Sequence, residues 1–207
     1  MKVVLIDYGA GNIRSVANAL NELGIQPEIV ADPAGLDGAT HLVLPGVGSF
    51  GDCMARLEER GLASALRERI AAGTPYLGIC LGYQILFETS EETSAGVAGL
   101  GIFKGKVKRF EDQPGLKVPH MGWNSVVPRQ PDSGFWQDLG SEPYFYYVHS
   151  YFPVPADDSI IAAETTYGSE TFAASIQTDK ILAAQFHPEK SQDAGQQLLK
   201  NFFALTA

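Results

Sequence analysis

The sequence predicts an α/β fold: a three-layer arrangement with a mixed, mainly parallel central sheet flanked by helices, and antiparallel strands in the second half. Short apolar runs alternate with helical periodicity over residues 1–90, which is typical of right-handed βαβ units. β-branched and aromatic runs punctuated by Gly, Pro and Asp then dominate residues 101–186. The length of 207 residues and the 45% hydrophobic content suit one packed domain over residues 1–207.

The first half is expected to contain four strands and their helices. Apolar residues at helical spacing from Ile13 to Leu23 predict a helix that ends at Gly24, and Gly61 is expected to divide a later helical segment. In chain order, the predicted elements are a strand at 3–7, a helix at 13–23, strands at 27–31 and 41–45, helices within 52–72, a strand at 76–80 and a helix at 81–89.

The second half is expected to add antiparallel strands to this core. They lie within residues 101–110, 125–128, 143–154, 159–167, 171–178 and 180–186. The chain then closes with a helix over 191–205, capped by Ser191. Its buried stripe is expected to comprise Leu198, Leu199, Phe202 and Leu205.

Composition excludes several classes of function. The 24 acidic and 15 basic residues give a net charge of −9, whereas nucleic-acid binding needs clustered Lys and Arg. The basic residues Lys104, Lys106, Lys108 and Arg109 lie on a strand with a period of two and are expected to form a solvated face. We expect neither a membrane span nor a signal peptide. Two cysteines and four histidines predict no disulfide framework, metal or cofactor, and a reducing cytoplasm.

The strongest local signal for chemistry is Gly78-Ile79-Cys80-Leu81-Gly82. A strand runs directly into a helix there, and Cys80 lies at the join, which matches a nucleophile elbow with sulfur in place of oxygen. The turn is so tight that side chains at the two glycine positions would collide. The elbow would direct the Leu81 N–H at a developing oxyanion, and the start of the helix would favour a thiolate. The alternative is a small buried cysteine in a strand.

Among the four histidines, His187 fits best as the base that a thiolate nucleophile needs. It follows a strand, and a carboxylate comes two positions later in His187-Pro188-Glu189. Proline biases His187 toward an extended backbone, in which residues i and i+2 point the same way. Glu189 is therefore expected to orient the imidazole as the third member of a triad with Cys80. Without the elbow, this tripeptide would be interpreted as an exposed turn.

Residues 46–51 contain a literal G-x-G-x-x-G after a strand. One interpretation is a dinucleotide site. Against it, the motif follows the third strand, and no acidic residue ends the next strand to hold a ribose, because that strand ends at Cys80. The interpretation that we prefer is an oxyanion loop beside the elbow, in which the N–H of Val47 or Gly48 is exposed.

Two other segments have simpler interpretations. Cys53 has neither an elbow nor a partner, so it is expected to pack in a helix. The loop-like phrase PHMGWN at 119–124 carries Trp123, which marks an interface or packs in the core.

The elbow followed by Gln84, together with His187-Pro188-Glu189, resembles the class I (triad) glutamine amidotransferases. The phrases DYGAGNIRSV, PGVGSFGDCM, KVPHMGWN, YVHSY and QFHPEKS narrow the resemblance to the glutaminase subunits of imidazole glycerol phosphate synthase, and they are distributed over nearly the whole chain. The elbow and the triad tripeptide are shared across the class, whereas DYGAGN and PHMGWN are specific to that subgroup.

The resemblance implies hydrolysis of glutamine to glutamate and ammonia through a thioester on Cys80. The oxyanion would meet the N–H of Leu81 and one from the Val47–Gly48 loop, and His187 would protonate ammonia and then activate water. The ammonia would pass to a separate (β/α)8 cyclase subunit, the partner in a heterodimer, for synthesis of imidazole glycerol phosphate and aminoimidazole carboxamide ribotide in histidine biosynthesis.

The resemblance also implies further roles. The substrate's polar ends would be held by Gln84, Glu92, His149, Ser150 and Tyr151. The cyclase would be faced by Asn12, Trp123 and Lys190, which favours the interface interpretation of PHMGWN. Other candidates are a different class I amidotransferase or a γ-glutamyl hydrolase, against which PHMGWN and the absence of a synthetase domain count. A nucleotide-binding module with a structural Cys80 is a further alternative.

Overall fold

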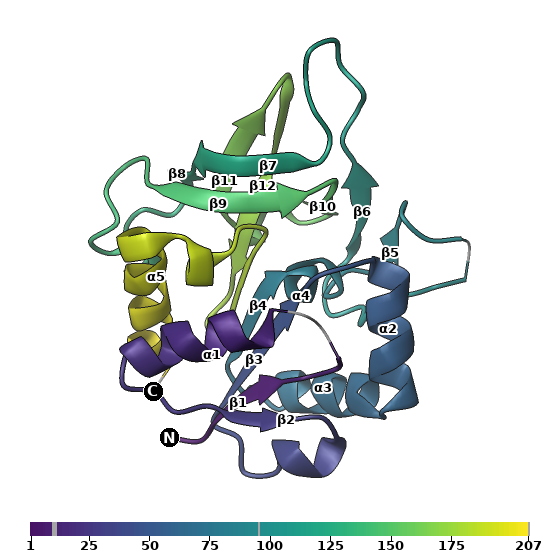
Figure 1. Cartoon of the computed structure of the whole chain (residues 1–207), viewed down its shortest axis with the longest axis vertical. Helices are drawn as coiled ribbons and strands as arrows, with labels where there is room; N and C mark the ends of the chain where they lie inside the picture. Colours follow the sequence, from purple (N-terminus) through teal and green to yellow (C-terminus); the bar gives the residue numbers. More distant parts are fainter. Residues whose placement is uncertain (10–11, 95, 207) are drawn as a thin grey trace.

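A computed structural model describes residues 1–9, 12–94 and 96–206, and this part of the chain forms an eight-stranded sheet and two smaller ones (Figure 1). The strand order in the large sheet is β2-β1-β3-β4-β13-β12-β11-β8. Its parallel strands are β1 (Val3–Ile6), β2 (Glu28–Val30), β3 (His41–Gly46), β4 (Tyr76–Cys80) and β13 (Ile181–Ala184). The antiparallel ones are β12 (Glu170–Gln177), β11 (Ile161–Tyr167) and β8 (Val127–Pro128).

Helices cover both faces of this sheet, as strand β1 illustrates. Val3 and Leu5 belong to one buried cluster and Val4 and Ile6 to the other, because successive side chains point to opposite faces. The first cluster is completed by α1 (Ile13–Glu22) and α5 (Gln192–Leu205), and the second by α2 (Phe50–Glu59) and α3 (Leu62–Ala71). The expected three-layer α/β fold with a mixed sheet is therefore confirmed.

Glycines end or interrupt the helices where the sequence predicts it. Gly24 follows α1 with φ of 76° and Gly61 separates α2 from α3 with φ of 69°, a left-handed conformation that glycine adopts without steric cost.

Strand β13 differs from expectation, because it pairs in parallel with β4 rather than joining only the antiparallel part. The register places Ala184 beside Ile79. The residues after β13 therefore leave the sheet beside the end of β4, which brings the His187 segment to Cys80.

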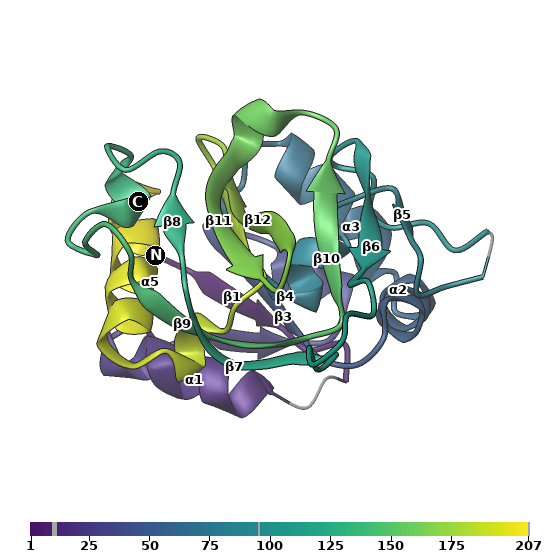
Figure 2. The same cartoon turned by 90° about the horizontal axis from the view of Figure 1, so that it is seen from above.

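The two smaller sheets lie beside one end of the large one. The first contains β10 (Tyr151–Pro155), β6 (Gly105–Arg109) and β5 (Thr89–Ser90). The second pairs β7 (His120–Ser125) with β9 (Tyr144–His149), and Figure 2 shows these two strands running side by side. The expectation that PHMGWN is loop-like is wrong, since most of it forms β7. Short 3₁₀ turns occupy Pro33–Leu36, Gly134–Trp136, Asp158–Ile160 and Pro188–Lys190.

The helix expected over residues 81–89 is also wrong in extent, because α4 covers only Leu81–Gln84. The carbonyl of Ile85 accepts from Leu100 N at 2.6 Å, and that of Leu86 accepts from Ile102 N at 2.9 Å. A neighbouring segment thus takes the carbonyls that a longer helix would need.

The last helix has two departures from expectation. Ser191 occupies the N-cap position of α5, but within the described residues its hydroxyl makes no capping bond. It donates to the His187 carbonyl at 2.6 Å and accepts from Tyr146 N at 3.0 Å. Leu198, Leu199 and Phe202 are buried as expected, whereas Leu205 is 49% exposed.

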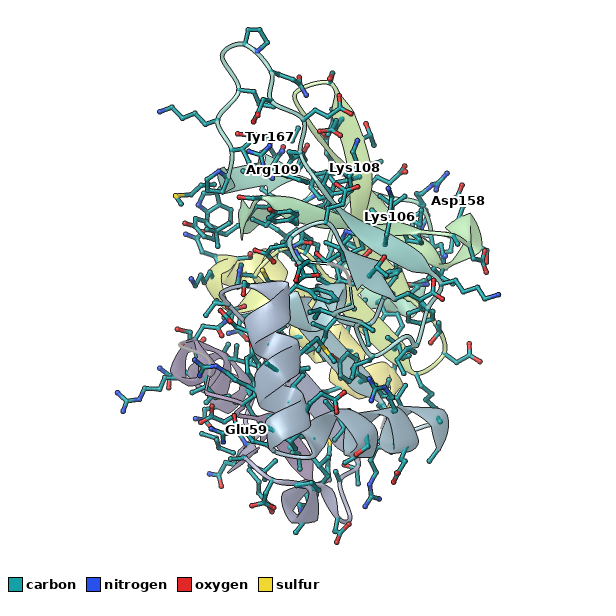
Figure 3. All side chains as sticks on the ribbon, turned by 90° about the vertical axis from the view of Figure 1, so that its right-hand side faces the viewer. Glu59, Lys106, Lys108, Arg109, Asp158 and Tyr167 are labelled. Carbon is teal, nitrogen blue, oxygen red and sulfur yellow. The ribbon has the colours of Figure 1, made fainter. Side chains whose placement is uncertain are left out.

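The basic residues of β6 are paired with carboxylates. Lys106 contacts Glu91 at 3.1 Å, Lys108 contacts Glu170 at 3.0 Å, and Arg109 lies 3.1 Å from an oxygen of the exposed Asp112. Figure 3 shows the three basic side chains at the outer side of the molecule, which confirms the solvated face. No helix in the described ranges has the length and apolarity to cross a membrane.

Candidate active site

Cys80 lies at a strained turn between β4 and α4. Its backbone has φ of 54° and ψ of −103°, a region in which a residue with a side chain costs roughly 1–3 kcal/mol. A Cβ on Gly78 would lie 2.6 Å from the Gly82 carbonyl oxygen, and one on Gly82 would lie 1.9 Å from the Leu44 carbonyl oxygen. Both flanking positions therefore need glycine, as the elbow predicts.

His187 and Glu189 meet beside this turn. His187 Nδ1 lies 2.8 Å from Glu189 Oε1, and both side chains are fully buried. The backbone of His187 is extended, and its N–H donates to the Tyr146 carbonyl at 2.9 Å. Asn12 Nδ2 donates to the same Glu189 oxygen at 3.2 Å. The carboxylate thus fixes Nδ1 as the protonated nitrogen, which directs Nε2 away from it.

The charges around His187 favour its protonated form. Burial lowers the pKa of this imidazole, but the Cys80 sulfur and the Glu189 carboxylate outweigh burial and raise the pKa to about 10. Among the described residues, Nε2 of His187 makes no hydrogen bond, although the Cys80 sulfur is near enough to raise the pKa of the imidazole. A protonated Nε2 would be available as a proton donor to a leaving group.

Val47 and Gly48 lie across the pocket floor from the elbow. Gly48 has φ of 101° with open space where a Cβ would point, and both residues line the same pocket as Cys80 and Leu81. Ser49 accepts from Asp52 N at 3.2 Å and caps α2. The loop thus lines the same pocket as the sulfur, where the oxyanion interpretation expects it.

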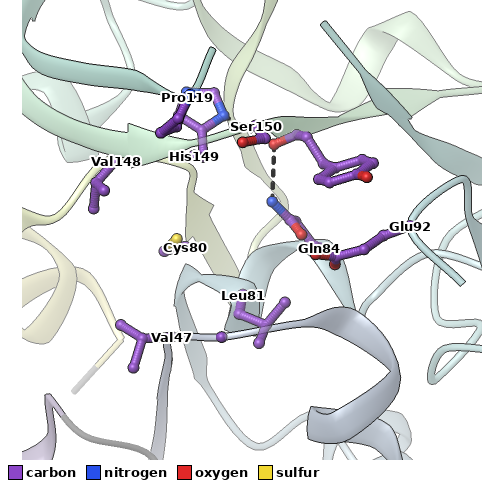
Figure 4. Close-up of a pocket in the computed structure, with 11 residues that line it drawn as sticks. Val47, Cys80, Leu81, Gln84, Glu92, Pro119, Val148, His149 and Ser150 are labelled. Atoms are coloured by element: carbon purple, nitrogen blue, oxygen red, sulfur yellow. Dashed lines mark hydrogen bonds between the residues drawn. The ribbon is translucent and has the colours of Figure 1, made fainter.

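A pocket of about 260 Å³ opens over Cys80 (Figure 4). This volume is just below the roughly 300–1,000 Å³ of typical ligand sites and suits a molecule of amino-acid size better than a dinucleotide. Its walls contain all five residues expected to hold substrate: Gln84, Glu92, His149, Ser150 and Tyr151.

Two of these residues have well-defined polar contacts. Gln84 Nε2 donates to the Tyr151 carbonyl at 2.9 Å, drawn as the dashed line in Figure 4. Glu92 Oε2 accepts from Phe50 N at 2.7 Å, at the start of α2, where an anionic group is favoured. The wall thus offers carboxylate and amide oxygens to a cationic group of a ligand.

Sequence reasoning missed three residues at the pocket. Pro119 and Val148 line it, and Gln185 Nε2 lies 3.6 Å from Cys80 Sγ. All three stand within quoted phrases, KVPHMGWN, YVHSY and QFHPEKS, but the phrases alone do not place these residues at the pocket.

The expected interface residues occupy different environments. Trp123 is 46% exposed on β7 and packs edge-on against Tyr146, and Lys190 Nζ lies 5.7 Å from the centre of the Tyr146 ring. Asn12 is instead buried against Glu189. Ala10 and Gly11, which belong to the DYGAGN phrase, lie outside the described residues.

Comparisons with known proteins agree with this geometry. A family model described as "Glutamine amidotransferase class-I" matches residues 4–205. The "Imidazole glycerol phosphate synthase subunit HisH" of Synechocystis sp. is 50% identical over 97% of this chain and 94% of its own, and that of Thermosynechococcus vestitus is 50% identical over 98% and 96%. A crystal structure of a glutamine amidotransferase is similar in fold, with a TM-score of 0.74, 23% identity and coverage of 100% and 99%.

Proposed function

Because this chain belongs to the class I glutamine amidotransferases, and within them to the HisH subunits of imidazole glycerol phosphate synthase, we propose that Cys80, His187 and Glu189 carry out its glutamine hydrolysis. The glutaminase activity serves histidine biosynthesis. The observation that supports these three residues most strongly is the strained elbow at Cys80, which opens into an amino-acid-sized pocket beside the 2.8 Å His187–Glu189 pair.

The reaction begins when the Cys80 thiolate attacks the side-chain amide carbon of glutamine. The C–N bond then breaks as His187 Nε2 gives its proton to the departing nitrogen, which leaves as ammonia. The resulting thioester is attacked by water, whose proton His187 takes up. Cleavage of the C–S bond releases glutamate and restores the thiolate and the protonated imidazole. Glu189 keeps Nδ1 protonated throughout and does not itself transfer a proton.

Backbone N–H groups stabilise the oxyanion that forms in both steps. The N–H of Leu81 comes from the elbow itself, and Val47 or Gly48 supplies a second donor across the pocket. Glu92 and the Oε1 of Gln84 would accept hydrogen bonds from the substrate's α-ammonium group, since both Gln84 N–H groups are engaged at 2.9 Å and 3.1 Å within the protein. His149, Ser150 and Tyr151 complete the wall that holds the substrate.

We further propose that residues 1–207 form one glutaminase domain that pairs with the (β/α)8 cyclase subunit in the cytoplasm. Exposed Trp123 and the neighbouring Lys190 are candidates for the contact face, because both pack on Tyr146. Asn12 is buried against Glu189, so it would influence that contact face through Glu189 rather than by touching the cyclase itself. Both cysteines are free thiols in this structure, which suits a reducing compartment.

Replacing each cysteine in turn tests this function. Ammonia release from glutamine should be abolished in Cys80→Ala and retained in Cys53→Ala, measured with the cyclase subunit and its nucleotide present. Retained turnover in Cys80→Ala would exclude the triad. Hydrolysis of γ-glutamyl peptides in preference to glutamine would favour the γ-glutamyl hydrolase alternative instead.

A further inference from the structure

We propose that Gln185 is a positioning residue for Cys80, and that hydrogen bonds through Gln84, the Tyr151 carbonyl and His149 connect it to His120 on β7. The inference rests on the proposed function only in taking Cys80 as the nucleophile.

The sheet register places Gln185 beside the sulfur. Ala184 pairs with Ile79 between the parallel strands β13 and β4, so the residues that follow this pair along the chain are Gln185 and Cys80. Gln185 is fully buried, and its N–H donates to the Ala174 carbonyl at 2.8 Å. Its side chain reaches the sulfur, with Nε2 at 3.6 Å from Sγ.

A main-chain carbonyl fixes the orientation of this amide. The Tyr151 oxygen can only accept, so the Gln84 atom 2.9 Å away must be the NH₂ group. That NH₂ also lies 3.1 Å from the Gln185 side chain, which must therefore present its oxygen. The NH₂ of Gln185 consequently faces Cys80 and donates to its sulfur.

The same carbonyl fixes the histidine pair on the other side. His149 Nδ1 lies 2.8 Å from the Tyr151 oxygen and must carry a proton. Burial lowers the pKa of His149 to about 3 and that of His120 to about 4, so both rings are neutral and His149 Nε2 accepts from His120 Nδ1 at 3.1 Å. His120 Nε2 accepts from Asn124 Nδ2 at 3.3 Å, which also donates to the Thr166 carbonyl at 3.0 Å.

The neighbouring groups fix the position of each of these protons. The hydrogen bonds from Asn124 to the Cys80 sulfur can therefore be arranged in only one way. The buried donors and acceptors that are paired in this network resist rearrangement. Gln185 therefore holds the sulfur in one position through a hydrogen bond from its side-chain N–H. Because β7 also carries exposed Met121 and Trp123, a displacement of this strand would reach Cys80 through His120.

Alkylation of Cys80 by iodoacetamide tests the positioning role without requiring catalysis. In full-length protein bearing Cys53→Ala, Gln185→Met removes the donor, and we expect the alkylation rate to fall about 10-fold. With the cyclase subunit present, kcat should fall by a similar factor while the KM for glutamine changes little. Gln185→Glu keeps the shape and places an oxygen at the sulfur, so it should slow alkylation at least as much.

The histidine end is tested by combining substitutions. His120→Phe keeps a ring stacked between Tyr147 and Tyr167, whose centroids lie 4.6 Å and 4.0 Å away, but removes the hydrogen bonds. It should lower kcat alone and have little further effect in a Gln185→Met background. Wild-type alkylation rates in both Gln185 variants, or fully additive losses with His120→Phe, would overturn this inference. Glutaminase activity in Cys80→Ala would instead overturn the proposed function.

Discussion

A methyl group at position 82 is the smallest change that should disable the elbow. An alanine Cβ there would lie 1.9 Å from the Leu44 carbonyl oxygen. Ordinary contacts of this kind are more than about 1 Å longer, and the obstacle is the main chain of β3 rather than a flexible side chain.

Because the new Cβ is fixed rigidly to the main chain of α4 and the obstacle is the main chain of β3, the strain must move β3 or α4. We expect Gly82→Ala to lower the free energy of unfolding by about 1–3 kcal/mol, as overpacking does. A displacement of about 1 Å at the nucleophile should also lower kcat/KM for glutamine about 100-fold. Urea unfolding and a coupled assay for glutamate measure the two effects separately.

Gly51→Ala is the matched control. It belongs to the other glycine-rich segment, residues 46–51, and its Cβ would meet only the Thr93 methyl group at 3.1 Å, near the start of α2. This variant should keep its stability to within about 1 kcal/mol, because alanine favours the helix. If Gly82→Ala matched the wild type in both assays, the close approach of α4 to β3 would not be what the elbow requires.

Two further predictions concern the titrating groups. Glu189→Gln should lower kcat substantially but less than His187→Ala, because Glu189 orients the ring without transferring a proton; Cys53→Ala in the same glutaminase assay serves as the control, and equal losses from Glu189→Gln and Cys53→Ala would contradict the role given to Glu189. His120 and His149 have pKa values lowered from 6.5 to about 4 and about 3 by burial, so the unfolded chain takes up protons below pH 6.5 that the folded chain does not. The contribution of each neutral histidine to stability is therefore fully present above that pH. The free energy of unfolding should then fall by up to about 1.4 kcal/mol per pH unit for each histidine between pH 6 and 4. Urea titrations of wild type and His120→Phe should show a shallower fall in the variant, and identical slopes would contradict the neutral state assigned to this pair.

Some features of the site could be predicted from the sequence because residues close together in the sequence determine them. The elbow at Cys80 needs glycine two residues away on each side. His187 and Glu189 also pair within three residues, although only His187 is extended and the 3₁₀ turn at Pro188–Lys190 brings the carboxylate to the ring. Strands such as β1 and β4 follow from apolar runs buried on both faces. These expectations about fold agree with the structure because nothing distant competes with them.

The errors arise where a distant segment decides the outcome. α4 stops at Gln84 because the segment around Leu100 takes the following carbonyls. β7 forms because β9, whose paired residues lie 19 to 29 positions further along the chain, offers a partner. Gln185 reaches the sulfur only through the register of β13 against β4. Ser191 bonds to His187 and Tyr146 instead of capping its own helix.

Mass spectrometry of the protein quenched during turnover tests the central claim most directly. With glutamine and the loaded cyclase subunit present, a γ-glutamyl thioester should be found on the peptide that contains Cys80 and should be absent from Cys80→Ala and from the peptide that contains Cys53. Ammonia release at the wild-type rate without any adduct on Cys80, or an adduct on Cys53 instead, would contradict the mechanism.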